Sequence, residues 1–200
     1  MKKSLYLLNV CGLSMYKKCV LYDTVRVPPT ELGEDIEISV SRALREKLEG
    51  RIDRHLGMIV SILDIVEIGD GHILFGDGAV YYDTTFEALV FQPVLQEVID
   101  GIVVEVVEFG AFVSIGPMDG LLHISQITSD FMSYDSKKAR LVAKDTKLSI
   151  SEGDKVRVRV VALSLNERDP RESKIGLTMR QVGLGKYEQL EEERKKEEVA

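Results

Sequence analysis

Residues 101–127 constrain the fold of this chain more than any other stretch. The segment reads GIVVEVVEFGAFVSIGPMDGLLHISQI and contains three short apolar or alternating runs separated by glycine-bearing turns. One turn falls at Phe109-Gly110 and the next at residues 117–120. Short strands joined by such turns are typical of a small antiparallel barrel. Gly110 and Gly116 are expected to form bends at barrel corners, where glycine adopts conformations that other residues resist.

The same stretch closely resembles the start of an S1 domain, the RNA-binding repeat first named for ribosomal protein S1. The residues that carry the resemblance are Gly101 and Val103, Phe109 to Val113, Asp119 to Leu121, and His123 to Ser125. The S1 fold is a five-stranded OB barrel, a class that binds single strands. The resemblance therefore implies two further strands, which we expect at residues 155–161 and 174–181.

The composition of the 200-residue chain fits one large or two small domains. Apolar residues make up 44% and charged residues 30%, which is ordinary for a soluble protein. The two cysteines, Cys11 and Cys19, provide neither a disulfide framework nor a metal quartet. We therefore expect a reducing, cytoplasmic location, inert thiols, no metal and no cofactor.

The net charge of −7 is unevenly distributed. Residues 15–97 carry eight basic and fifteen acidic side chains, a net −7, whereas residues 153–181 carry seven basic and four acidic ones, a net +3. An acidic chain with one basic segment does not resemble a duplex-DNA binder. It is compatible with a local patch for single-stranded RNA.

The first fourteen residues are interpreted as an N-terminal extension. Lys2 and Lys3 precede the run Leu5-Tyr6-Leu7-Leu8, which loosely resembles a signal peptide. Asn9 interrupts this run, which is too short to span a membrane. Met15 is an alternative natural start.

Residues 15–95 read as an α+β domain. A strand over residues 19–27 is stopped by Pro28-Pro29. Apolar residues at helical spacing predict a helix from Ile36 that ends at Gly50 or Gly57. Strands are then expected over residues 58–68 and 79–91, with Pro93 near the domain boundary.

Between those last two strands lie two Asp-Gly pairs, which predict a projecting hairpin or loop with two turns. The simple interpretation is a pair of tight turns; the alternative is a tip that contacts a partner through exposed apolar side chains. The candidate docking residues are Gly69, Asp70, Gly71, Ile73, Leu74, Phe75, Gly76, Asp77 and Gly78. No Lys-Ser/Thr pair follows the glycines, which disfavours a phosphate-binding loop.

Downstream of the first barrel strands, residues 128–151 are expected to form a surface insertion in a barrel domain that covers residues 96–185, with a helical turn as one option. Residues 186–200 carry a net −2 and are expected to form a solvated, charged tail.

The whole constellation resembles one family, the larger stalk subunit of archaeal DNA-directed RNA polymerase, equivalent to the seventh subunit of the eukaryotic enzymes. The supporting motifs are Met15-Tyr16-Lys17, Val25 to Pro29, Gly69 to Tyr82 and Thr178 to Gln181. The resemblance implies a truncated-RNP-like α+β domain that docks on the polymerase core, followed by an S1-type OB barrel that guides emerging RNA. It also implies a smaller partner, the small stalk subunit, and a non-catalytic role in initiation and elongation.

The candidate RNA-binding residues combine aromatic rings with cations. Bases of any identity stack on aromatic rings, and S1 domains carry aromatics and a histidine on the ligand face. Lys155, Arg157 and Arg159 alternate with valines, so they share one outward face of a strand. The full set is Phe109, Phe112, His123, Lys155, Arg157, Arg159 and Arg180. The phenylalanines could instead be core residues, His123 could instead make a structural hydrogen bond, and the cations could simply be solvated.

The sequence offers little support for catalysis. It has no Ser-His-Asp signature, and its carboxylates do not match a two-metal nuclease. Two other classes of protein remain open: an accessory subunit of an RNA-degrading complex, and a translation factor that carries an S1 barrel. The latter would lack the tip at residues 69–82.

Overall fold

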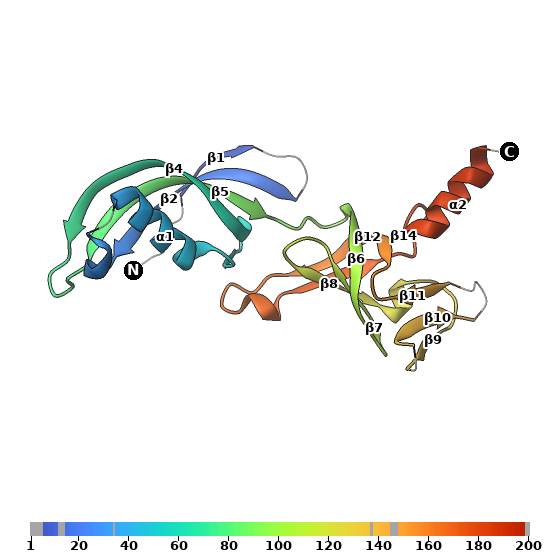
Figure 1. Cartoon of the computed structure of the whole chain (residues 1–200). Coiled ribbons are helices and arrows are strands. Elements are labelled where there is room, and N and C mark those ends of the chain that lie inside the picture. Colours follow the sequence, from blue (N-terminus) through green and yellow to red (C-terminus); the bar gives the residue numbers. More distant parts are fainter. Residues whose placement is uncertain (1–5, 12–14, 34, 137, 145–147, 199–200) are drawn as a thin grey trace. The chain divides into compact units, whose positions relative to one another are not determined.

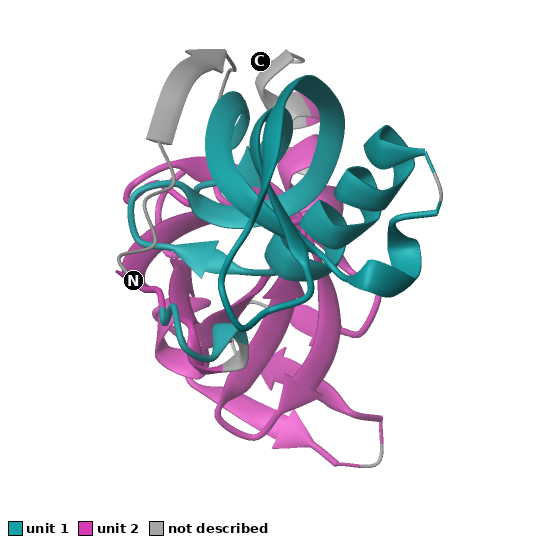
Figure 2. Cartoon of the chain, turned by 90° about the vertical axis from the view of Figure 1, so that its left-hand side faces the viewer, with its two compact units in different colours: residues 1–92, 166–170 teal, residues 93–165, 171–200 magenta. Residues whose placement is uncertain are grey.

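The computed structural model describes residues 6–11, 15–33, 35–136, 138–144 and 148–198. The chain divides into two compact units (Figure 2). The first comprises residues 1–92 with 166–170, and the second comprises residues 93–165 with 171–200. Both units consist mostly of strands with few helices (Figure 1).

The first unit is built on a five-stranded antiparallel sheet in the order β1-β2-β5-β4-β3. Its strands are β1 (Tyr6–Cys11), β2 (Tyr16–Val27), β3 (Ile52–Asp53), β4 (Gly57–Ile73) and β5 (Val80–Phe91). Within the expected extension, residues 6–11 pair with β2 as an edge strand, and residues 1–5 and 12–14 lie outside the described residues. The long strands predicted from the sequence are thus present.

One helix, α1 (Ile36–Leu48), packs against β2 and β4. The Asp35 carboxylate caps it by accepting a hydrogen bond from the Glu37 amide at 3.1 Å, which satisfies one free donor of the first turn. Val40, Leu44 and Leu48 recur at helical spacing and are buried against the sheet, in a core that includes Leu21 and Phe86. The helix ends just before Gly50, one of its two predicted ends. Gly50 has a φ of +76°, a left-handed conformation that is common just after a helix.

The hairpin of β4 and β5 differs from the expected pair of Asp-Gly turns. Gly69, Asp70 and Gly71 lie inside β4, where the pairing with β5 shifts register between Ile68 and Gly71. The chain reverses only at residues 74–79, where Gly76 has a φ of +88° and the Asp77 amide donates to the Leu74 carbonyl oxygen at 3.1 Å. The first Asp-Gly pair is therefore a bulge rather than a turn.

The second unit contains the predicted five-stranded barrel. Its strands are β6 (Val98–Val107), β7 (Gly110–Ser114), β8 (Asp119–His123), β12 (Lys155–Ser164) and β13 (Lys174–Thr178). They follow the order β13-β8-β7-β6-β12, and a further pairing of β13 with β12 closes the barrel. The valines at 156, 158 and 160 are buried, so the alternating cations of β12 point outward as predicted.

Two glycines show what the barrel requires. A Cβ on Gly110 would lie 2.4 Å from the Leu122 carbonyl oxygen, so only glycine lets β7 approach β8 this closely. Gly116 instead has a φ of +125° in the turn after β7. The predicted roles therefore differ: Gly116 forms a bend, and Gly110 permits close packing.

The described residues of the insertion form a small sheet, with no helical turn among them. Strands β9 (Met132–Asp135), β10 (Arg140–Ala143) and β11 (Ser149–Ser151) pair antiparallel, and Leu141 and Ile150 are fully buried. The expectation of a helical turn was wrong because the alternating apolar residues of three very short strands bury one face of a sheet. Beyond the barrel, β14 (Gly185–Lys186) pairs with β12 and leads into the charged helix α2 (Tyr187–Glu198).

Candidate nucleic-acid interface and exposed tip

Phe109 and Phe112 form an aromatic pair on the outside of the barrel. Their ring centroids are 6.5 Å apart in an edge-to-face arrangement. Phe109 is 51% exposed at the turn between β6 and β7, whereas Phe112 is half-buried on β7. Phe109 is therefore not a core residue, and its ring is free to stack on a planar ligand.

His123 and Arg180 lie beside this pair. His123 pairs with Gly110 across β7 and β8, and the Ile124 amide donates to the Phe109 carbonyl oxygen at 2.9 Å. The His123 Nδ1 lies 2.9 Å from the Ser125 hydroxyl oxygen, while the ring remains exposed. Arg180 donates to the Ser125 carbonyl oxygen at 3.4 Å. His123 thus makes a structural hydrogen bond and still presents its ring to solvent.

The three cations of β12 do not share one environment. Lys155 is exposed and pairs with Ile102, which in turn pairs with Ser114 on β7. Lys155 therefore lies two strands away from Ser114, and Ser114 is two residues along β7 from Phe112. From the usual spacing between strands and the rise per residue, Lys155 is about 12 Å from Phe112. Arg157 lies about 7 Å farther along β12 than Lys155. Arg159 pairs with Thr178 on β13, which pairs with β8, so the closed barrel brings Arg159 back toward the strand of His123.

Arg157 is held in an ion-pair network with Asp100 and Tyr187. Its Nε donates to one carboxylate oxygen of Asp100 at 2.7 Å and its Nη2 to the other at 3.2 Å. The same Nη2 donates to the Tyr187 hydroxyl at 2.8 Å, and that hydroxyl donates to Asp100. The hydrogen bonds from Arg157 hold the pKa of Asp100 below its usual range. This network joins β6, β12 and α2, so Arg157 has a structural role.

The structure therefore brings together only part of the predicted set. Phe109, Phe112, His123 and Arg180 form one cluster with Lys155 nearby, and we name this cluster the barrel face. Arg157 is instead tied into its network with Asp100 and Tyr187. Arg159 pairs with Thr178, two residues before Arg180, but its Nε is buried and has no hydrogen-bond partner among the described residues.

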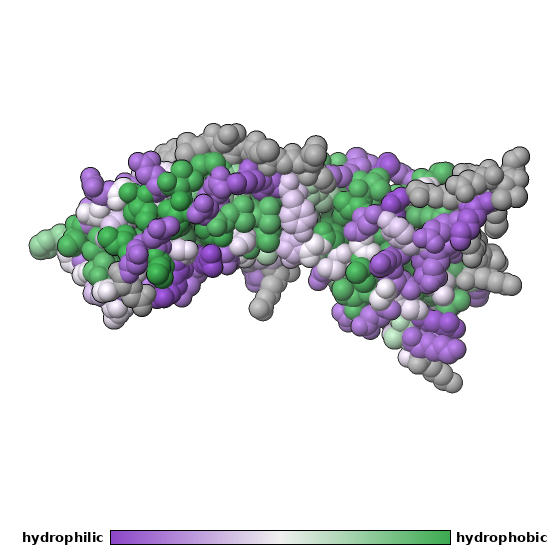
Figure 3. Space-filling model, turned by 45° about the horizontal axis from the view of Figure 1, so that its top comes forward, coloured by the Kyte–Doolittle hydropathy of each residue, from purple (hydrophilic) through white to green (hydrophobic). Residues whose placement is uncertain are grey.

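The turn of the β4–β5 hairpin exposes three consecutive apolar side chains. Ile73 is 70% exposed, Leu74 is exposed, and Phe75 is fully exposed, as expected from the sequence. Figure 3 shows hydrophobic side chains at the surface at the end of the unit where Figure 1 places this turn. We call residues 73–78 the tip.

Two residues outside the candidate docking set hold the tip in place. Arg26 on β2 donates through Nε and Nη2 to both carboxylate oxygens of Asp77, each at 2.9 Å, and the Tyr81 hydroxyl donates to Asp77 at 2.7 Å. The Ala79 amide donates to the same carboxylate at 3.1 Å. The hydrogen bond from Arg26, with those from Tyr81 and Ala79, holds the pKa of Asp77 well below its usual range. No local pattern could have shown this, since Arg26 lies 51 residues from Asp77.

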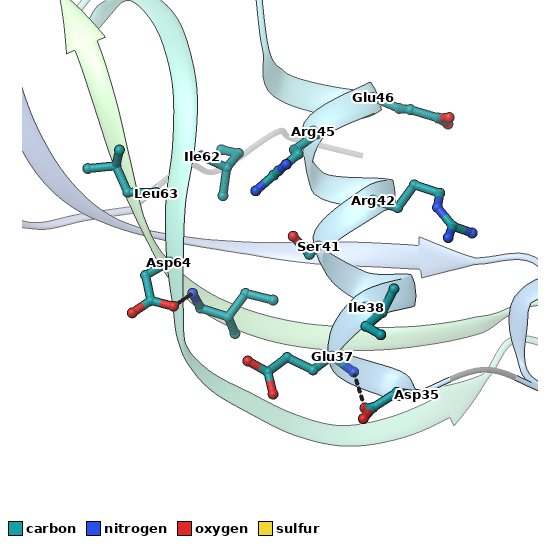
Figure 4. A pocket seen from close by; sticks show the side chains of 11 residues that line it. Asp35, Glu37, Ile38, Ser41, Arg42, Arg45, Glu46, Ile62, Leu63 and Asp64 are labelled. Atoms are coloured by element: carbon teal, nitrogen blue, oxygen red, sulfur yellow. Dashed lines mark hydrogen bonds between the residues drawn. The ribbon is translucent and has the colours of Figure 1, made fainter.

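An open groove of about 520 Å³ lies between α1 and β4 (Figure 4). Ile38 and Leu63 are exposed along it, and Arg42, Arg45 and Asp64 add charges of both signs. A groove this open suits contact with a macromolecular surface better than enclosure of a small molecule.

The described residues offer little support for a metal site or a reactive cysteine. Within them, no group of three or more His, Cys, Asp or Glu side chains is arranged to hold a metal ion. Burial raises the pKa of the Cys19 thiol, which disfavours the reactive thiolate. None of the helices in the described ranges is long and apolar enough to cross a membrane.

Comparison with known families finds two matches along the chain. Residues 23–78 match the SHS2 domain found in the N terminus of Rpb7p/Rpc25p/MJ0397, and residues 93–173 match the S1 RNA binding domain. The first match spans β2, α1, β4 and the tip, and the second spans the barrel strands up to the start of β13.

Comparison with individual proteins finds relatives along most of the chain. "DNA-directed RNA polymerase subunit Rpo7" of Saccharolobus shibatae is 41% identical over 183 residues, which is 90% of this chain and 100% of the relative. "DNA-directed RNA polymerase III subunit RPC8" of Saccharomyces cerevisiae is 26% identical over 76% of each chain. Among solved structures, Mycoplasma genitalium RNase R covers 42% of this chain and 13% of its own at 20% identity, with a TM-score of 0.35. A TM-score this low supports no conclusion.

Proposed function

Since this chain belongs to the Rpo7 family of DNA-directed RNA polymerase subunits, we propose that it docks on the polymerase core through the tip and binds emerging single-stranded RNA on the barrel face. As a member of that family it is a non-catalytic stalk subunit of the polymerase. The observation that carries the proposal is the pairing, in one chain, of an exposed apolar tip with an S1 barrel that exposes an aromatic ring.

The tip supports the docking role because its apolar side chains have no cover within the first unit. Ile73, Leu74 and Phe75 would lose their contact with water in a complex, which favours association. The contacts of Asp77 with Arg26 and Tyr81 hold the turn in one conformation before binding. A preorganised loop loses less conformational entropy on association than a mobile one.

The barrel face supports RNA binding through two kinds of contact. Phe109 and the half-buried Phe112 stack on bases, which is tolerant of sequence because every base has a π-face. Arg180 and Lys155 contact phosphates, and the exposed His123 ring adds a base or phosphate contact. Arg157 is left out of this face because Asp100 neutralises it. Arg159 is left out because its Nε is buried.

The proposal extends to a partner and to a location. The small stalk subunit of the polymerase pairs with this chain, and the complex acts in the cytoplasm during initiation and elongation. The groove between α1 and β4 offers one surface for a protein partner. An accessory role in an RNA-degrading or translation complex is disfavoured, because full-length polymerase subunits match 90% of the chain.

Co-purification tests this function directly. The tagged full-length chain is expected to recover the large polymerase subunits and one small partner from a lysate of its source cells. Recovery of a nuclease core or of a ribosomal subunit in place of the polymerase would contradict the proposed function.

A further inference from the structure

The insertion sheet presents an outer face that the proposed function does not use. Leu141 and Ile150 are buried, and β10 and β11 contact β6, so one face of this sheet packs on the barrel. Because side chains alternate along a strand, the opposite face points to solvent. That outer face carries Phe131, Ser133, Asp135, Arg140, Val142, Lys144, Ser149 and Ser151.

Phe131 and Lys144 form a defined pair on this face. The Lys144 amide donates to the Phe131 carbonyl oxygen at 3.1 Å, which extends the pairing of β9 and β10 by one residue each. The Lys144 Nζ lies 4.7 Å from the centroid of the Phe131 ring, a cation–π contact. The ring is nevertheless 67% exposed, more than Phe109 on the barrel face.

The surroundings of the pair favour an anionic, planar ligand. Arg140 lies 3.5 Å from Asp135, which accounts for that carboxylate, and Lys138 is exposed at the turn between β9 and β10. The outward residues of β11 are the serines 149 and 151, small hydroxyl donors. An exposed ring, cations and hydroxyls on an open sheet are the components with which proteins hold single-stranded nucleic acid.

The outer face of the insertion also continues from the barrel face. The Gln126 carbonyl oxygen accepts from the Met179 amide at 2.8 Å, next to the contact of Arg180 with Ser125. Phe131 follows Gln126 by five residues, so their Cα atoms are at most about 17 Å apart. Figure 1 shows β9 to β11 beside the barrel strands β6 and β7.

We propose that single-stranded RNA bound on the barrel face continues onto the insertion, where one base stacks on Phe131 and the adjacent phosphate contacts Lys144. The proposal rests on the proposed RNA-binding role of the barrel and adds a second contact to it. A lysine stem lying over a phenylalanine is also an ordinary surface arrangement, so the test must separate RNA binding from packing.

RNA length separates the two contacts. Single OB folds occupy about 4 to 16 nucleotides, so an oligoribonucleotide of about 4 nucleotides fills the barrel face and one of about 16 also reaches the insertion. In fluorescence anisotropy with the full chain, Phe131→Ala is expected to weaken binding of the long RNA by about ten-fold or more and to leave binding of the short RNA unchanged. Phe131→Tyr keeps the ring and should restore binding of the long RNA.

Salt dependence tests the cation. Lys144→Gln is expected to lower the slope of log affinity against log salt for the long RNA by about 0.7, whereas Phe131→Ala should leave this slope unchanged. Val66→Ala removes an exposed apolar side chain of the first unit, and Lys195→Gln removes a charge of α2. Both serve as matched controls that should bind both RNAs like the wild type.

The outcomes distinguish this proposal from the function on which it rests. If Phe109→Ala weakens both RNAs and Phe131→Ala weakens neither, the barrel binds RNA and the insertion does not. If neither variant changes binding, the barrel face itself is wrong and its extension fails with it. If Phe131→Ala lowers recovery of the polymerase core while RNA affinity is unchanged, the patch is a protein contact and the proposal is overturned.

Discussion

At the scale of single residues, Gly110 is the position where the barrel tolerates a side chain least. An added Cβ would lie 2.4 Å from the Leu122 carbonyl oxygen and 3.0 Å from the His123 Cα, and both are backbone atoms that cannot rotate away. Gly110→Ala is therefore expected to lower the free energy of unfolding by about 1–3 kcal/mol, as overpacking does. Urea unfolding of the full chain measures this change.

The matched control is Gly33→Ala. A Cβ at Gly33 meets no atom within 4 Å, so the free energy of unfolding should change by less than about 0.5 kcal/mol. Equal stability of the two variants would show that β7 and β8 are not packed as closely as described.

The two cations Lys155 and Arg157 are neighbours in the sequence pattern but differ in their pairing. Lys155→Gln is expected to lower the salt slope of RNA binding by about 0.7, because the exposed lysine contacts a phosphate. Arg157→Gln is expected to leave the slope unchanged, because Asp100 already neutralises the guanidinium. Filter binding across a salt series measures both slopes. Equal slope changes for the two variants would return Arg157 to the RNA-binding face.

The sequence could not reveal this difference between the two residues. Alternation with buried valines correctly predicted that both side chains point outward. The partner of Arg157 is Asp100, which lies 57 residues away and reaches it only through the pairing of β6 with β12. Exposed aromatics of a known motif were easier to predict, because Phe109 is placed by the local turn before Gly110.

At the scale of elements, the length of each periodic run decided what could be predicted. The strands β2, β4 and β5 and the helix α1 are long enough for their apolar period to show, and all were expected. The insertion was misread because β9, β10 and β11 have only three or four residues each. The first Asp-Gly pair was misread because the position of the turn depends on the register of β4 against β5 and not on local turn residues.

The tip is the element whose conformation depends most clearly on one side chain. Asp77→Asn keeps an oxygen for the Ala79 amide but removes the ion pair with Arg26. The turn at residues 74–79 should then exchange its amide hydrogens faster, while the paired part of β4 and β5 remains protected. Hydrogen exchange read by mass spectrometry or NMR measures both regions. Asp70→Asn, the same change at an exposed position in β4, should leave exchange at the turn unchanged.

Acidity should reproduce the effect of Asp77→Asn. The native pKa of Asp77 is lowered, so its ion pair stabilises the tip at pH values above the unfolded-state pKa of about 4 and this stabilisation is lost as the pH falls through the native pKa. Near neutral pH the stability of the tip conformation should therefore not change with pH. A turn that loosens between pH 6 and 8 on the wild-type chain would contradict this assignment.

At the scale of the whole molecule, we assign separate tasks to the two units. The first unit matches the N-terminal SHS2 domain of polymerase subunits and exposes the tip, and the second matches the S1 domain and exposes the barrel face. The pairing of these two kinds of domain was predictable because each has an ordered set of sequence motifs. The groove between α1 and β4, which we propose as a surface for a protein partner, was not predictable, since it forms only in the folded chain.

The most direct test measures core recovery and RNA affinity on the same two full-length variants. Phe75→Asp places a charge in a contact that loses water on docking, which carries a large free-energy penalty. It should abolish recovery of the polymerase core and leave RNA affinity unchanged. Phe109→Ala should recover the core normally and weaken RNA binding by about five-fold or more, without loss of thermal stability, because the ring is exposed. Core recovery that is unchanged by Phe75→Asp, or RNA affinity that is unchanged by Phe109→Ala, would contradict this division of tasks.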